Sequence, residues 1–233
     1  MTEQLDRRAD LTRLQILRAA SRQFAHKPYS LVSLDDILAD AAVTKGALYF
    51  HFRSKHALAS SIVDHRAEQA RVTVAEVLAR NLSGLETLID ISYLLAVDDI
   101  SETMARAGLN LVESIGRMDN LGPRMLDSWA QGFTEIGRRA VTEGDLAADS
   151  DPGAMARLLV AMYMGIRQTS DLDVPARFLT DLEQAWNLIL PSFVSPDRLS
   201  YLTQFIRRRT ALAIRNAAPL LPDEPAVRRD GTA

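Results

Sequence analysis

The stretch VTKGALYFHFRSKHAL, from Val43 to Leu58, concentrates side chains that can carry charge or donate hydrogen bonds. It holds three aromatic residues, two histidines, two lysines, one arginine and one glycine, in a chain otherwise rich in leucine and alanine. Three kinds of chemistry could use such a set: a catalytic histidine, a metal site, or a surface that lies against a polyanion. Lysine, threonine and tyrosine can donate to phosphate oxygens, and lysine can also contact the acceptor edge of guanine.

The histidines favour neither catalysis nor metal binding. His51 and His56 are five residues apart, whereas two metal ligands on one helix face are typically four apart. His65, with Asp64 and serines nearby, could form a nucleophile–base pair, but no serine lies in a strand–turn–helix elbow and no glycine-rich phosphate loop occurs. The sequence therefore predicts no catalytic residue, no metal and no cofactor, and we do not expect an enzyme.

The composition is that of a globular protein with unevenly distributed charge. The 233 residues are 47% hydrophobic and 24% charged, include no cysteine, and carry a net charge of −3. Residues 1–60 hold nine Lys/Arg against six Asp/Glu, which suggests a basic end that faces nucleic acid on an acidic body. The polar N-terminus and the lack of an apolar run of roughly 18 to 20 residues predict a cytoplasmic protein with no membrane contact.

Apolar residues recur at three- and four-residue spacing without sustained strand-like alternation, which predicts an all-α protein. Residues that typically end or begin helices support this prediction. Gly144 follows one predicted helix, Asp151 and Pro152 begin the next, and Ser195 is a predicted cap for a helix that begins at Pro196. The larger helices are predicted at about residues 54–80, 83–97, 101–116, 122–143, 152–171, 175–190 and 196–216. The tail at 217–233, with three prolines and little to bury, is predicted to be disordered.

The charged stretch falls on the second of two short predicted helices. The first runs from about Ser33, its predicted N-cap, to Asp40, and after a tight turn at residues 41–43 the second begins near Thr44. This is a helix-turn-helix. In its second helix the predicted inward residues are Ala47, Leu48, Phe50 and Phe52, and the predicted outward residues are Lys45, Gly46, Tyr49 and His51.

Gly46 is the informative residue of that second helix. A glycine inside a helix costs roughly 1 kcal/mol relative to alanine, so a helix that keeps one usually needs its backbone close to something else. A DNA phosphate or base edge is a suitable neighbour. Thr44 at the helix N-terminus and Lys55, just after Ser54, are predicted to add phosphate contacts at the same edge.

The segment from about Thr12 to Leu58 closely resembles the N-terminal domain of the tetracycline-repressor (TetR) family of bacterial regulators, whose pattern is TSLDDIAxxAGVTKGALYxHFxSKxxL. The match runs without a gap over about forty-five residues, and it departs at HKPYS and at Ala42, where the family often has glycine. The resemblance implies a homodimer, double-stranded operator DNA as partner, a DNA-reading helix from Thr44 to Phe50, and a C-terminal domain that binds a small effector. The candidate DNA-binding residues are Ser33, Thr44, Lys45, Gly46, Tyr49, His51 and Lys55.

The rest of the chain resembles the γ-butyrolactone autoregulator receptors within that family. The similarity lies in the YFHF of the DNA helix, in a tryptophan-containing helix followed by EGDL and DP, and in LILPSF near the end. In those receptors this tryptophan lines the effector cavity, which makes Trp129 the first candidate here, although a large apolar residue at helical spacing is more often plain core. The weaker ligand-binding candidates are Phe133, Leu109, Val112, Met162, Tyr163 and Gln168, the last as a polar contact.

These observations predict a DNA-binding domain at residues 1–53 and an effector-binding and dimerisation domain at 54–216, followed by the tail at 217–233. Small residues within 152–169 and 177–190 predict a four-helix dimer interface; they are Ala154, Ala156, Ala161, Gly165 and Ala185. The predicted function is a TetR-type repressor that a small apolar effector, such as a γ-butyrolactone-like signal, releases from a pseudo-palindromic operator. Two alternatives remain open: a regulator that responds to another lipophilic compound, such as a drug or acyl metabolite, or a helical adaptor that binds only protein.

Overall fold

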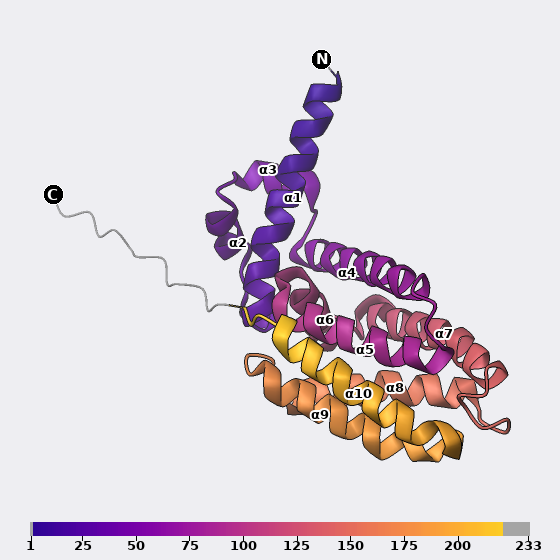
Figure 1. Cartoon of the computed structure of the whole chain (residues 1–233). Coiled ribbons are helices and arrows are strands. Elements are labelled where there is room, and N and C mark those ends of the chain that lie inside the picture. The colour runs from indigo at the N-terminus through magenta and orange to yellow at the C-terminus, as the bar shows by residue number, and fades with distance from the viewer. Residues whose placement is uncertain (1, 221–233) are drawn as a thin grey trace.

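The computed structural model describes residues 2–220, which fold into α-helices joined by short connections, with no β-strand in that range. Figure 1 shows a small unit of α1, α2 and α3 at one end and a larger body below it. The small unit consists of α1 (Thr2–His26), the 3-10 turn η1 (Tyr29–Leu31), α2 (Leu34–Ala41) and α3 (Lys45–His51). The body consists of α4 (Lys55–Leu78), α5 (Gly84–Ser101), α6 (Thr103–Ile115), η2 (Met118–Asn120), α7 (Leu121–Thr142), α8 (Pro152–Thr169), α9 (Pro175–Ile189), η3 (Leu190–Ser192) and α10 (Pro196–Asn216).

The all-α class is confirmed, and each large helix begins and ends within about four residues of its predicted bounds. Residues 217–220 are not helical, and the rest of the predicted tail, 221–233, lies outside the described residues. Among the helices of residues 2–220, none is both long and apolar enough to cross a membrane.

The small unit is held by a core that α3 enters with one face. Leu48 and Phe52 are 0% and 3% exposed and belong to the same buried cluster as Ile16 of α1 and Ile37 of α2. The prediction that Phe50 packs inward is wrong, because its side chain is 80% exposed. At about 100° per residue, position 50 lies some 200° around the helix from position 48 and so on the opposite face.

The turn between α2 and α3 depends on one residue in a left-handed conformation. The Ser33 side chain caps α2 in a reciprocal capping box with Asp36, and the Thr44 side chain caps α3 by accepting from the backbone N–H of Ala47. Between them Ala42 has φ 50° and ψ 39°. This conformation normally favours glycine, so the departure from the family pattern at Ala42 falls where the backbone is strained.

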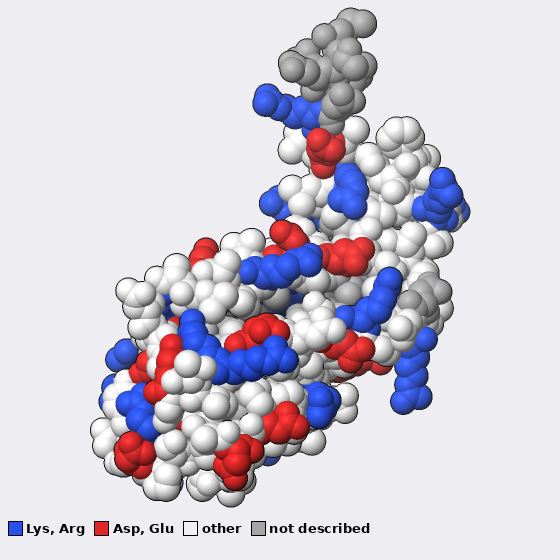
Figure 2. Space-filling model, turned by 90° about the vertical axis from the view of Figure 1, so that its right-hand side faces the viewer, with Lys and Arg blue, Asp and Glu red and all other residues white. Residues whose placement is uncertain are grey.

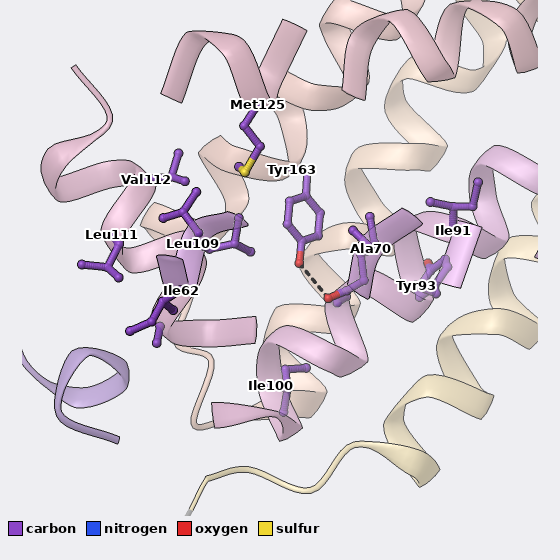
Figure 3. Packing of buried hydrophobic residues seen from close by; sticks show 14 of the residues in the cluster. Ile62, Ala70, Ile91, Tyr93, Ile100, Leu109, Leu111, Val112, Met125 and Tyr163 are labelled. Atoms are coloured by element: carbon purple, nitrogen blue, oxygen red, sulfur yellow. Dashed lines mark hydrogen bonds between the residues drawn. The ribbon is translucent and has the colours of Figure 1, made fainter. Parts of the chain in front are cut away.

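The body is a stack of helices with α5 buried inside it. Figure 3 shows Ile91, Tyr93 and Ile100 of α5 among buried side chains from the surrounding helices, including Ile62 of α4 and Tyr163 of α8. The predicted breaks are confirmed where α7 ends before Gly144, at φ 79°, and where Asp151 caps α8 ahead of Pro152. Ser195 was predicted to cap α10. The helix does begin at Pro196, whose ring fixes φ near the helical value, but the Ser195 side chain makes no cap hydrogen bond, so the predicted cap is wrong.

Candidate functional site

The outer face of α3 is exposed at the end of the molecule that lies away from the body (Figure 1). Lys45, Gly46 and Tyr49 are exposed as predicted, and Phe50 joins them. His51 is partly buried, with its ring 5.0 Å from the Phe50 ring in an edge-on arrangement. The surface therefore combines a cation, a phenol, an apolar ring and bare backbone on a single helix face.

No neighbour within the chain requires Gly46 to be glycine. A Cβ added there would meet only the Thr44 hydroxyl oxygen, at 4.0 Å. Packing within the chain therefore does not explain why α3 contains a residue that lowers the stability of the helix.

Three other predicted DNA-binding residues have structural partners. The Lys55 ammonium group donates to the backbone carbonyls of Tyr29 and Val32, both at 2.8 Å, and lies 4.2 Å from the centre of the Tyr29 ring. The Ser33 hydroxyl donates to the Asp36 carboxylate at 2.6 Å, and the Thr44 hydroxyl oxygen is the α3 cap. Two of the three Lys55 donors therefore hold η1 and the chain before α2, a role that the sequence did not reveal.

The charge asymmetry of the sequence is visible on the surface. In Figure 2 the end that carries the small unit shows mostly Lys and Arg, whereas acidic and basic side chains are interspersed over the body. A basic end of this kind attracts the phosphate backbone of a nucleic acid independently of sequence.

The body holds a small cavity of about 20 Å³ between α5, α7, α8 and α9. It is lined by Leu88, Ser92, Leu95, Trp129, Phe133, Leu159, Val160, Met162, Tyr163 and Trp186. Four of the seven predicted ligand-binding residues are therefore brought together: Trp129, Phe133, Met162 and Tyr163. At this size the cavity has room for about one water molecule, so any larger occupant must displace part of its wall.

A second space lies on the other side of part of that wall. A groove of about 190 Å³, with a largely apolar lining, runs between α4 and α7, and Leu95, Trp129 and Phe133 line both the groove and the cavity. Trp129 and Phe133 are only partly buried, in contrast to Trp186, which is 0% exposed. These two rings separate the cavity from the groove.

The other three predicted ligand-binding residues lie elsewhere. Leu109 and Val112 are buried on α6 and line none of the pockets described here; Figure 3 shows both within the packed core. Gln168 is exposed on α8, one position past the buried Arg167, so it does not point toward the cavity. Helical rotation of about 100° per residue turns Gln168 to the outer face while Tyr163 and Arg167 face inward.

Two of the three polar groups at the cavity come from residues that were not predicted to bind a ligand, Ser92 and Trp186. The indole N–H of Trp186 donates to the Ser92 hydroxyl at 2.9 Å, and that hydroxyl donates to the backbone carbonyl of Ile89. The Tyr163 hydroxyl donates to the Leu95 carbonyl and to Asp99, and burial raises its pKa well above the ordinary value, so it stays protonated. The resemblance drew attention to one tryptophan, whereas tertiary packing supplies the second.

One face of α8 and α9 is exposed along its length. On α8 it carries Ala154, Leu158, Ala161 and Gly165, spaced by four, three and four residues, and on α9 Leu188 is 81% exposed. A Cβ added at Gly165 would meet nothing within 4 Å. Ala156, predicted in the same set, is instead 0% exposed inside the chain, and Ala185 is partly buried.

No group of three or more His, Cys, Asp or Glu that could hold a metal ion occurs among the described residues.

Comparison with known proteins identifies relatives of both parts of the chain. Residues 16–62 match the family described as bacterial regulatory proteins, tetR family. Over 196 residues the chain is 32% identical to the A-factor receptor protein of Streptomyces griseus. The matched region covers 84% of this chain and 68% of that protein. The chain is also 29% identical over 163 residues to the transcriptional regulator AcuR of Cereibacter sphaeroides, which covers 64% of this chain and 71% of that protein.

Solved structures have the same arrangement over most of the chain. A γ-butyrolactone receptor described as an ArpA-like protein superposes with a TM-score of 0.76 at 29% identity, covering 88% of this chain and 99% of that chain. CprB of Streptomyces coelicolor, solved in complex with its biological operator sequence, superposes with a TM-score of 0.75 at 28% identity. The superposition covers 88% of this chain and 99% of the CprB chain. These relatives are receptors and regulators rather than enzymes.

Proposed function

We propose that this chain, which belongs to the tetR family of bacterial regulatory proteins and to its ArpA-like subgroup, is a transcriptional repressor that a small apolar effector releases from its operator. The observation that carries the proposal is α3, a capped helix of a helix-turn-helix whose outer face is exposed and contains a glycine that no internal contact requires. Such a helix fits the major groove of duplex DNA, and its backbone can approach closely at Gly46.

Individual residues of α3 have different expected roles. Lys45 can contact a phosphate or a guanine edge, and the Tyr49 hydroxyl can donate to a phosphate. Phe50, 80% exposed, can pack on a thymine methyl group. Lys55 remains a candidate phosphate contact with the one donor that its two carbonyl partners leave available.

The test is operator binding by purified protein, with duplexes selected from a random pool by the wild type. We expect Gly46→Ala to raise the melting temperature and to lower affinity for every selected duplex, because the added methyl group blocks backbone approach. Gly132→Ala on α7 is the matched control, since a Cβ there meets nothing within 4 Å, and the substitution should stabilise the helix without affecting DNA binding. Phe50→Ala should relax selection at one base pair. Full operator affinity in Gly46→Ala and Phe50→Ala would refute the assignment of α3.

We propose that the effector occupies the cavity after displacing Trp129 and Phe133 toward the groove between α4 and α7. Joining the two spaces gives an apolar site with a few polar groups, which suits an amphiphile with an acyl chain and a lactone or hydroxyl head. A γ-butyrolactone is the first candidate because the A-factor receptor protein and the γ-butyrolactone receptors are relatives. Another lipophilic compound is the alternative, and mass spectrometry of small molecules that copurify with the native protein distinguishes them.

The dimer is proposed to form through the exposed face of α8 and α9. Two copies related by a two-fold axis would present two α3 helices to successive major grooves, roughly 34 Å apart, and would select a pseudo-palindromic operator. Gly165→Leu tests the interface: because the position faces open space within the chain, the monomer should fold normally while sedimentation shows loss of the dimer. An intact dimer in that variant would place the interface elsewhere.

A further inference from the structure

We propose that a chain of hydrogen bonds through Asp99, Arg167 and Asn110 couples the wall of the effector cavity to the C-terminal end of α1 in the DNA-binding unit. The inference rests on the proposed function for its purpose, because it assigns positioning residues to the release of DNA. Its geometry stands independently, and its first test needs neither operator nor effector.

The chain begins at a residue that lines the cavity. The Tyr163 hydroxyl, on α8, donates to Asp99 Oδ2 and to the Leu95 carbonyl, both at 3.3 Å, and Figure 3 marks a hydrogen bond of this hydroxyl with a dashed line. A hydroxyl hydrogen bond is typically about 2.7 to 2.8 Å long, so this shared donor is held weakly by each partner. An acceptor on an effector in the cavity can therefore take the Tyr163 donor away from Asp99.

The middle of the chain is a fully buried ion pair. Asp99 accepts from Arg167 Nε at 2.7 Å and from Arg167 Nη2 at 3.2 Å, and the two side chains are 0% and 2% exposed. Arg167 also donates to Glu113 and, through Nη2, to Asn110 Oδ1 at 2.7 Å. Water cannot replace a lost partner at this depth, so a change in the position of Asp99 must be accommodated by Arg167 and in turn by α6.

The far end of the chain is the last turn of α1. The final carbonyls of a helix have no partner within the helix, and the Asn110 amide satisfies two of them by donating to the carbonyls of Phe24 and Ala25, at 3.0 and 3.1 Å. Asn110 thus contacts Arg167 with its oxygen and α1 with its nitrogen. One side chain on α6 joins the body to the small unit.

Helix α1 in turn fixes the helix-turn-helix. Arg22 makes a bidentate ion pair with Asp40 of α2, with its closest N–O distance at 2.7 Å, and the Gln15 amide donates to the Ala41 carbonyl at the turn, also at 2.7 Å. A shift at the end of α1 is therefore transmitted to the turn that orients α3. The coupling runs from the cavity wall through three side chains to the elements that contact DNA.

The first experiment measures hydrogen exchange of the full-length protein without DNA. Tyr163→Phe removes only the hydroxyl that contacts Asp99, and we expect the amides of residues 24–27 to exchange about two- to tenfold faster than in the wild type. Tyr93→Phe is the matched control, because Tyr93 is also a buried tyrosine, but its hydroxyl bonds Thr210 of α10 at 2.7 Å, outside the chain of contacts. Equal exchange of residues 24–27 in all three proteins would overturn the proposal.

The second experiment is a double-mutant cycle on operator affinity, with duplexes selected by the wild type. The effects of Tyr163→Phe and Asn110→Ala on the operator dissociation constant should be non-additive by about two- to thirtyfold. The effects of Tyr93→Phe and Asn110→Ala on the same constant should be additive. Asn110→Asp, which keeps the acceptor for Arg167 but removes both donors to α1, replaces the alanine variant if that variant does not fold. Additivity in both cycles would refute the coupling. If no duplex can be selected at all, the proposed function fails, while the exchange experiment still decides on the coupling.

Discussion

Trp129 and Trp186 line the same cavity, but truncating them should have different effects because only one is enclosed. Trp186 is 0% exposed and bonds Ser92, so Trp186→Ala should cost about 3 to 5 kcal/mol, the usual cost of removing a buried aromatic ring, part of which is the cavity left behind. Trp129 is partly exposed and borders the groove of about 190 Å³. Its removal opens the cavity to the groove and to water, so the cavity contribution is largely absent and about 2 kcal/mol of lost apolar burial remains.

Trp129→Ala, the less destabilising of the two substitutions, should have a large effect on the response to the effector. Trp129→Ala should leave the dimer and its operator affinity close to wild type. It removes the wall against which an acyl chain would pack, so the effector concentration that releases half of the DNA should rise about tenfold or more, equivalent to about 1.4 kcal/mol of lost contact.

The assay combines urea unfolding of both variants with titration of the operator complex, using a γ-butyrolactone that carries a medium-length acyl chain and a series of other lipophilic compounds. Trp129→Phe serves as a conservative control that keeps an aromatic wall and should respond more like the wild type. Two results together would show that Trp129 is a core residue and that the effector binds elsewhere. Trp129→Ala would lose 3 kcal/mol or more of the free energy of unfolding, and the compound that releases DNA from the wild type would release it from the variant at the same concentration.

Three further predictions concern stability. Ala42→Gly removes the strain of a left-handed alanine, about 1 to 2 kcal/mol, but glycine also gains conformational freedom in the unfolded chain. The free energy of unfolding should therefore rise by about 0.5 to 1 kcal/mol. Asn81→Gly is the control: its φ of 52° is similar, but asparagine tolerates this conformation, so the free energy of unfolding should rise less. Arg66 is 1% exposed, and its only ion pair among the described residues, with Asp98, is 3.5 Å long. The Asp98 side chain is 32% exposed, so water can solvate its carboxylate, and Arg66→Met should keep or raise the melting temperature; a fall of more than a few degrees would contradict this. Hydrogen bonds from the Ser33 hydroxyl and backbone N–H lower the pKa of Asp36 below 3.8. The wild type should therefore be more stable than Asp36→Asn by its largest margin above about pH 4, and this margin should vanish as the pH falls through the lowered pKa. Melting temperatures of both proteins measured over this pH range test the prediction.

The sequence by itself determined the helices and most of the exposed face of α3. Those features depend on short-range signals: an apolar spacing of three and four residues, the caps Ser33, Thr44 and Asp151, and a glycine in a helix that has no internal need for it. Caps and periodicity act between residues at most a turn or two apart, so they can be recognised without knowledge of the fold. The error at Phe50 came from assigning an aromatic ring to the core when its helical phase places it on the exposed face of α3.

Only the tertiary structure decided what surrounds the cavity and what connects it to α1. Trp186 and Ser92 meet across 94 positions in the sequence, and Asn110 contacts α1 across 85 and 86. Lys55 donates to carbonyls that lie 23 and 26 positions earlier. Gln168 and Arg167 are neighbours in sequence, yet one faces solvent and the other a buried carboxylate. Such contacts depend on how whole helices pack. Because apolar residues recur along each of these helices, composition alone does not distinguish a side chain that lines a cavity from one that fills the core.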